Sequence, residues 1–314
     1  MIKSIALFAS SLLVASLLLV ARPIQAQQIQ GQQTPSAKVA VTTVVTVLGP
    51  SFAAPPALGK DDVVVHTGDR REDVIGWDQA QGDRAALQLA ILIDDGTDLG
   101  TYLDELRHFI QAQPNSTSVG VFYASMGMTQ TIAPFSTDHD AVAKKVRITL
   151  GPSGTSTSIY LSLIDVLKKL QSAKGRREIL LIGDGHDRLR GDLQSPDVDS
   201  VIENAQRTGI VIHTLYASVG RSNRISFRQS LAQSNLIRVA GESGGQSFFQ
   251  GLGTPVSFTP FLDQLDMVLH NQYFLTFMTV RSKNPKGQFR GFKVATEQHH
   301  VSITAADQIF VPGP

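Results

Sequence analysis

The stretch LAILIDDGTDLGTYLDEL (residues 89–106) decides the fold of this 314-residue chain. It opens on a continuous apolar run, which is typical of a strand covered on both faces of a parallel sheet. The run ends at a polar loop that contains Asp94, Asp95 and Asp98, and apolar residues then recur at helical spacing up to Gln113. A buried strand, a carboxylate-rich loop and a helix in this order predict the first unit of an α/β domain.

The segments that follow repeat this alternation. Apolar runs predict further buried strands at 117–125, 177–185 and 210–218, with residues 129–136 as a hairpin partner and 246–251 as a short last strand. Amphipathic stretches between them predict helices at 138–149, 157–173, 200–209, 227–245 and 258–272. The alternation predicts an α/β fold with a doubly wound, mostly parallel, Rossmann-like sheet over residues 87–272.

Both ends of the chain have the pattern of antiparallel strands instead. Residues 38–48 (KVAVTTVVTVL) are rich in β-branched side chains, and residues 61–80 predict a hairpin with its turn at 67–69. The tail, 273–314, alternates apolar and polar residues between polar turns. We expect the segments 38–86 and 273–314 to pair into a small β-subdomain, built as a β-sandwich, with the α/β domain inserted between them.

The first 26 residues have the pattern of a secretory signal peptide. Lys3 precedes an apolar run from Ile5 to Val20, and cleavage is expected after Ala26. The alternative is an uncleaved anchor, because the run is near the lower limit for spanning a membrane. The Gln- and Gly-rich residues 27–37 predict a disordered lead-in.

The composition fits an exported bacterial protein, secreted or periplasmic. The chain contains no cysteine, so no disulfide framework supports the fold. Its formal net charge is +1 with acids and bases scattered, which predicts no nucleic-acid partner and no membrane contact beyond the signal segment.

Two of the predicted parallel strands end in acids, at residues 94–98 and 184–187, and a hydroxyl-rich cluster lies at 151–158. Ligands of doubly wound sheets bind at the carboxyl ends of the strands. Carboxylates and hydroxyls without thiols suit Mg²⁺ or Ca²⁺ rather than zinc. The sequence therefore predicts a candidate site for one of these ions at that edge of the sheet.

Residues 87–272 resemble a von Willebrand factor type A (VWA) domain. In that family a metal-ion-dependent adhesion site (MIDAS) uses Asp-x-Ser-x-Ser after the first strand, a threonine in a later loop and an aspartate after the fourth strand. The matching positions here are Asp94, Thr157 in GTSTSIYLSL and Asp184 in IGDGHD. The chain ends, with ALGKDDVVVHTGDRRE and NQYFLTFMTV, resemble bacterial exported proteins that have a von Willebrand-related domain.

The first motif departs from the family pattern at both serines. Gly96 has no side-chain oxygen, and Asp98 places a carboxylate where the family has a hydroxyl. The resemblance implies a degenerate site of Asp94, Gly96, Asp98, Thr157 and Asp184 around Mg²⁺ or Ca²⁺. In the family a carboxylate of the partner completes the coordination, and three aspartates here would make an acidic partner group less favourable.

Each of these residues also has a purely structural interpretation. Asp94 and Asp98 are suited to capping a helix that begins near Leu99, and Thr157 is suited to capping the next one. Asp187 is expected to be solvated or to form an Asx-turn, and His186 to lie at the rim of the site.

A catalytic role is not expected. The letters DDGT resemble the Asp-x-Asp-Gly-Thr motif of haloacid-dehalogenase-type phosphatases, but Ile93 stands at the position of the attacking aspartate. The sequence therefore predicts a non-enzymatic, exported protein-binding module for adhesion or assembly, whose strand-end face contacts a protein ligand. The alternative is a metal-free structural component of the bacterial cell envelope.

Overall fold

The computed structural model describes residues 37–150, 158–190, 195–217, 227–251, 253 and 255–314. The account below concerns the compact unit Ala37–Pro314. The predicted signal peptide and almost all of the predicted lead-in lie outside the described residues, so both stay predictions. Within the described ranges, no helix has the length and apolar character needed to cross a membrane.

A six-stranded sheet forms the centre of the α/β part, as predicted. Its strand order is β6-β5-β4-β7-β8-β9, and every neighbouring pair is parallel except the antiparallel pair β5 and β6. Numbered along the chain this order is 3-2-1-4-5-6, a doubly wound arrangement whose topological switch point lies between β4 and β7. The strands are β4 (Leu87–Asp94), β5 (Thr117–Ser125), β6 (Met128–Ser136), β7 (Arg176–Gly183), β8 (Val211–Tyr216) and β9 (Ser247–Phe248).

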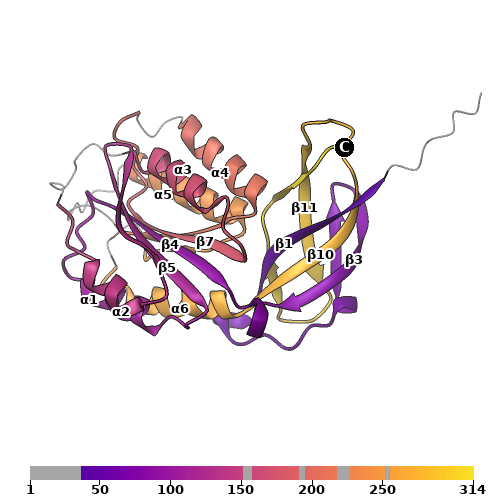
Figure 1. The fold of residues 1–314 in the computed structure, drawn as a ribbon, viewed down its shortest axis with the longest axis horizontal. Coiled ribbons are helices and arrows are strands. Elements are labelled where there is room, and N and C mark those ends of the chain that lie inside the picture. Colours follow the sequence, from indigo (N-terminus) through magenta and orange to yellow (C-terminus); the bar gives the residue numbers. More distant parts are fainter. Residues whose placement is uncertain (1–36, 151–157, 191–194, 218–226, 252, 254) are drawn as a thin grey trace, which may run out of the picture. The chain divides into compact units, whose positions relative to one another are not determined.

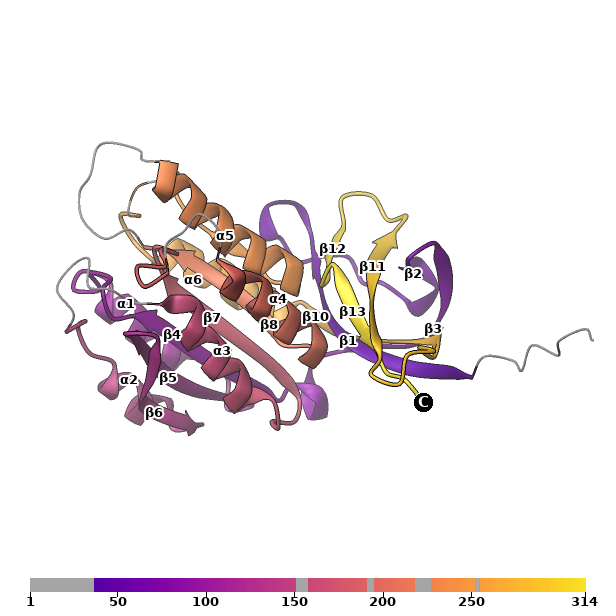
Figure 2. The same cartoon turned by 90° about the horizontal axis from the view of Figure 1, so that it is seen from above.

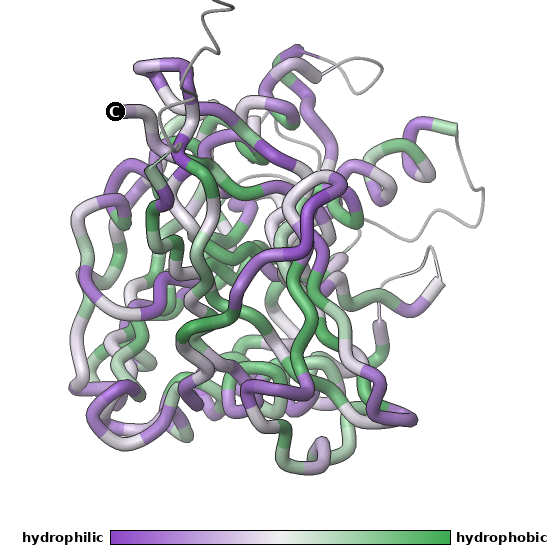
Figure 3. Tube along the Cα trace, turned by 90° about the vertical axis from the view of Figure 1, so that its right-hand side faces the viewer, coloured by the Kyte–Doolittle hydropathy of each residue, from purple (hydrophilic) through white to green (hydrophobic). Residues whose placement is uncertain are grey.

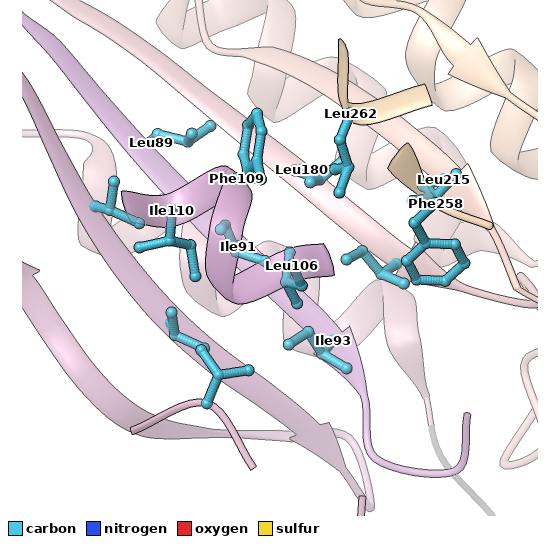
Figure 4. Packing of buried hydrophobic residues seen from close by; sticks show 14 of the residues in the cluster. Leu89, Ile91, Ile93, Leu106, Phe109, Ile110, Leu180, Leu215, Phe258 and Leu262 are labelled. Carbon is cyan, nitrogen blue, oxygen red and sulfur yellow. The ribbon is translucent and has the colours of Figure 1, made fainter. Parts of the chain in front are cut away.

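Helices cover both faces of this sheet (Figure 1). One face packs against α1 (Leu103–Ala112), α2 (His139–Lys145) and α6 (Thr259–His270), and the other against α3 (Ile159–Leu170), α4 (Pro196–Thr208) and α5 (Phe227–Ser243). Side chains alternate along β4, because successive residues of a strand point to opposite faces. Leu89, Ile91 and Ile93 join the first cluster (Figure 4), and Ala90 and Leu92 join the second. The continuous apolar run of β4 thus follows from burial on both sides.

Three predicted helices differ from those observed. The helix expected over 200–209 begins four residues earlier, at Pro196. The helix expected near Leu99 begins at Leu103, because Leu99 is fully buried in a turn that precedes the helix. The helix expected over 138–149 ends at Lys145, since Val146 leaves the helical conformation and the next residues turn towards Asp95. Residues 227–243 form a single helix.

The two chain ends form one seven-stranded antiparallel sheet, in the order β12-β1-β10-β3-β2-β11-β13 (Figure 2). The C-terminal strand β10 lies between the N-terminal strands β1 and β3, so the expected pairing of the two ends is confirmed. The strands are β1 (Lys38–Leu48), β2 (Val63–Thr67), β3 (Arg70–Gln79), β10 (Gln272–Val280), β11 (Gln288–Thr296), β12 (Ser302–Thr304) and β13 (Gln308–Val311).

This subdomain is a single curled sheet and not the predicted sandwich of two sheets. The rings of Phe277 on β10 and Phe292 on β11 stack with centroids 5.4 Å apart, although β3 and β2 lie between their strands in the sheet. Strands three positions apart in a flat sheet are separated by about 14 Å, so the sheet must fold over its own apolar face. Figure 3 shows hydrophobic residues along the inner strands and hydrophilic residues at the turns.

Candidate functional site at the switch point

The carboxyl ends of β4 and β7 bring two buried aspartates together. The two strands pair in register up to Ile93 and Ile182, so Asp94 and Asp184 follow at the same edge of the sheet. Their exposed fractions are 0% and 2%. A Cβ atom added to Gly183 would lie 3.0 Å from the Cβ of Asp94. The glycine therefore leaves room for the Asp94 side chain between the strand ends.

Arg188 lies against both carboxylates. Its Nη1 donates to Asp184 Oδ1 at 3.3 Å, and its Nη2 donates to Asp184 Oδ2. Nη1 also lies 3.8 Å from Asp94 Oδ2. The Arg188 side chain is 19% exposed. Bidentate contact between a guanidinium and a carboxylate is among the stronger polar interactions in proteins, so this site holds a compact Asp–Arg–Asp group.

The loop after β7 turns back towards the strand ends and places Arg188 beside Asp184. Asp187 is buried, and its Oδ1 accepts hydrogen bonds from the backbone N–H groups of Leu189 at 3.1 Å and Arg190 at 2.9 Å. Asp187 therefore closes an Asx-type turn, one of the two alternatives predicted for it. Gly185 has a φ of +76° and accepts a hydrogen bond from the Tyr160 hydroxyl at 2.8 Å.

Asp95 anchors a second loop at the same edge. Its Oδ1 accepts from Arg147 Nη1 at 2.9 Å and from the backbone N–H of Leu150 at 3.0 Å. The Arg147 guanidinium also lies 4.1 Å from the centroid of the Tyr123 ring. Burial raises the pKa of the Tyr123 hydroxyl, which keeps that group neutral and able to donate to the carbonyl of Arg147. These contacts hold residues 147–150 beside the switch point.

The structure brings together only part of the predicted ligand set. Gly96 donates its backbone N–H to Asp94 Oδ1 at 2.9 Å, which places it next to the aspartate pair. Asp98 is exposed, and its Oδ1 accepts from the N–H of Gly100 at 3.0 Å. Thr157 lies outside the described residues. The alternative role of Asp94 and Asp98 as caps of a helix near Leu99 is wrong, because that helix begins at Leu103.

The described residues fit a divalent cation poorly. Mg²⁺ and Ca²⁺ require six or more oxygen ligands at about 2.0–2.6 Å, whereas both Oδ2 atoms of Asp94 and Asp184 face the Arg188 guanidinium. In the described ranges, no three His, Asp or Glu side chains are grouped as a metal site requires. Metal binding by the predicted residues stays a prediction.

Sequence reasoning missed Arg188 and Arg147, whose guanidinium groups contact the aspartates of this edge. Both lie in irregular loops, where no periodicity indicates which way a side chain points. The available signal was the spacing of Asp184 and Arg188, four residues apart within a cluster of acids.

Comparisons with known proteins give distant structural likenesses. No protein-family model matches the chain, and no curated protein matches it in sequence. An aerotolerance-related membrane protein from Bacteroides fragilis NCTC 9343 is 15% identical with a TM-score of 0.41, covering 59% of this chain and 98% of its own. The conserved hypothetical protein BatB from Bacteroides thetaiotaomicron is 14% identical with a TM-score of 0.40, covering 58% of this chain and 98% of its own.

The SpRpn10 VWA domain is 14% identical with a TM-score of 0.39, covering 58% of this chain and 94% of its own. At these values the likenesses carry no argument about function. The fold itself has the predicted features: a doubly wound order, an antiparallel edge strand β6, a strand β4 that ends at Asp94 and a strand β7 that is followed by Asp184. The α/β part of the chain, from Leu87 to His270, thus has the doubly wound α/β fold that the resemblance to a VWA domain implies.

Proposed function

We propose that this chain is an exported, non-enzymatic protein-binding module that contacts its partner with the loops at the carboxyl ends of the parallel strands. The observation that carries the proposal is where the exposed apolar side chains lie. Among the described residues, eight of the eleven exposed large hydrophobic side chains belong to these loops or to the strand and helix ends next to them. We call this set the apolar collar: Met126, Met128, Ile148, Leu150, Leu189, Phe227, Phe249 and Val256.

The collar residues come from several elements at the edge of the sheet that holds the switch point. Met126 lies in the β5–β6 turn and Met128 is the first residue of β6, and a Cβ added to Gly127 between them would be 3.3 Å from Leu189 Cδ1. The backbone of Leu150 is fixed to Asp95, one residue after Asp94. Segments from distant parts of the sequence, at residues 126–128, 150 and 189, thus present apolar side chains at the same edge of the sheet as the Asp–Arg–Asp group.

Exposed apolar side chains gathered in one region indicate an interaction surface, because water-exposed hydrophobic area is stabilised when a partner covers it. Met is also well suited to binding surfaces, since its flexible side chain adapts to a partner's shape. Binding at loops held by a rigid sheet is the common arrangement in doubly wound domains. The expected partner is a protein that covers the collar with apolar side chains of its own.

Site-specific photocross-linking in the source cell tests this proposal. A photoreactive residue at Met128 or Leu150 should capture the same discrete partner, whereas one at Ile75 or Met267 should not. Ile75 and Met267 are matched controls, because both are exposed apolar residues outside the collar. Excess purified chain should compete for the partner, and the variant Met128→Ser/Leu150→Ser should compete at least tenfold less well, the effect of about 1.4 kcal/mol.

Equal capture from the control positions, or equal competition by the double variant, would contradict binding of a partner at the collar.

Export is supported by the residue pattern of 1–26 and is tested separately. The mass of the mature chain should correspond to a first residue of Gln27. A mature chain that still begins at Met1 would favour the uncleaved anchor.

A further inference from the structure

We infer that Arg188 is a built-in cation at the switch point, which takes the place of a divalent ion between Asp94 and Asp184. The inference concerns the charge balance of the site and is independent of what the collar binds. It reverses the metal prediction for these aspartates: the positive charge that they require is covalently part of the chain.

Among the described contacts, each Oδ1 of the two carboxylates accepts from a backbone N–H of its own loop, Asp94 from Gly96 at 2.9 Å and Asp184 from His186 at 3.0 Å. Asp184 Oδ1 also accepts from Arg188 Nη1 at 3.3 Å. Each Oδ2 is directed to Arg188. The backbone thus orients both carboxylates so that their second oxygens point to one common position, and a guanidinium occupies that position.

The burial of the two aspartates makes a cation there necessary. Two carboxylates with exposed fractions of 0% and 2% have lost most of their hydration, and they repel one another when both carry a charge. Removing the positive partner from such a buried group is strongly destabilising, because it leaves uncompensated charge. Arg188 supplies that charge at every physiological pH, since a guanidinium does not deprotonate in proteins.

A metal ion and Arg188 exclude each other at this site. A cation bound to both Oδ2 atoms would sit at about 2.0–2.6 Å from each, in the space of the Arg188 Nη atoms. It would also place two positive groups in contact. Binding of Mg²⁺ or Ca²⁺ therefore requires Arg188 to leave, at the cost of its bidentate contact with Asp184.

The test compares thermal unfolding of the full chain in EDTA, Mg²⁺, Ca²⁺ and Mn²⁺. The Tm of the wild type should be the same in all four conditions. In EDTA, the Tm of the variant Arg188→Ala should be about 5–10 °C below that of the wild type. A divalent cation should restore part of this Tm by binding in the space that the Arg188 side chain vacates. The recovery should disappear in Arg188→Ala/Asp184→Asn, which lacks one of the two carboxylates.

Arg190→Ala is the matched control, because Arg190 lies on the same loop but is 52% exposed and pairs with Asp197 at 3.1 Å. It should lower the Tm much less and should not respond to metal. A saturable rise of the wild-type Tm with any of these ions would overturn the inference. So would an Arg188→Ala variant as stable as Arg190→Ala, or one that no divalent cation stabilises. If Arg188→Ala does not fold, the test rests on the wild type and on Arg188→Lys. Arg188→Lys should fold, and its Tm should not change with a divalent cation. A rise of its Tm with metal would overturn the inference.

Discussion

The two ends of the parallel sheet each contain an arginine with little solvent exposure, but in different surroundings. At the amino end, Arg176 is 5% exposed, and its guanidinium donates to the carbonyls of Leu269 at 2.7 Å and Ala85 at 2.9 Å and to Gln272 Oε1 at 2.6 Å. At the carboxyl end, Arg188 neutralises two aspartates beneath loops with exposed apolar side chains.

The difference separates a joint from a proposed binding surface. The partners of Arg176 come from the segments on which the chain enters and leaves the α/β part, so this arginine joins the parallel sheet to the antiparallel one. The described acidic partners of Arg188 come from the strand ends, and loops at the same edge carry the collar. One end of the sheet is closed by the rest of the chain, and the other carries the side chains that we propose to contact a partner.

The largest expected effect is at the amino end. Arg176→Met should reduce the free energy of unfolding by about 3–5 kcal/mol, because it leaves buried carbonyls without donors and Glu178, 4.0 Å away, without its cation. Urea unfolding followed by circular dichroism measures this loss. Arg84→Met, which removes an exposed arginine paired with Asp78, is the control. A loss no larger than that of the control would contradict the role of a joint.

An intermediate effect is expected where the switch-point loop turns. Gly185→Ala should cost about 2–4 kcal/mol, because the residue has a φ of +76° and its new Cβ would lie 2.5 Å from the Ala232 carbonyl oxygen and 2.7 Å from Leu236 Cγ. Gly82→Ala is a matched control, with a φ of +56° and nothing within 4 Å of the added Cβ. Equal unfolding free energies for the two variants would show that close packing at Gly185 does not fix the loop.

The smallest effect concerns a contact that holds part of the collar. Glu105 on α1 accepts hydrogen bonds from Ser257 Oγ at 2.8 Å and from the N–H of Thr259 at 2.6 Å, next to Val256. Burial raises the pKa of this carboxyl, but these hydrogen bonds outweigh it and lower the pKa below 4.5. Glu105→Gln should therefore cost about 1 kcal/mol at neutral pH.

The pH dependence of this last variant has a definite sign. A carboxyl with a lowered folded-state pKa stabilises the fold above its unfolded value of 4.5, and the stabilisation disappears as the pH falls through the folded value. The stability difference between wild type and Glu105→Gln should thus be constant above about pH 5.5 and shrink below pH 4.5. A difference that grows on acidification would contradict the assigned contact.

The strands were predictable because burial on both faces leaves a direct mark on the sequence. The apolar run of β4 and the aspartate that ends it indicated the edge of the sheet at which the candidate site lies. The start of α1 was not predictable, since Leu99 fits a helical apolar pattern but is buried in a turn. The alternating pattern of the tail strands is equally compatible with a sandwich and with a single curled sheet. Which of the two forms depends on tertiary contacts such as that of Phe277 with Phe292.

The candidate site was predicted in its acids but not in its base. Aspartates at strand ends are placed by the strands, whereas Arg188 is placed by the turn that Asp187 closes. The turn residues were recognisable, but the direction in which an arginine extends from a loop depends on the tertiary structure. Asp98, which the family pattern places in the site, accepts a hydrogen bond from the N–H of Gly100, and its role as a ligand stays a prediction.

The position of β10 between β1 and β3 has a consequence for how the molecule is made. Lys38 pairs with Val280, so β1 has no β10 beside it until nearly the whole chain has been synthesised. Contacts between residues this far apart form slowly, and an unpaired β-branched strand is prone to aggregation. The antiparallel sheet should thus be the last part to be completed, and a chain cut short before β10 should be protected by chaperones or lost to proteolysis.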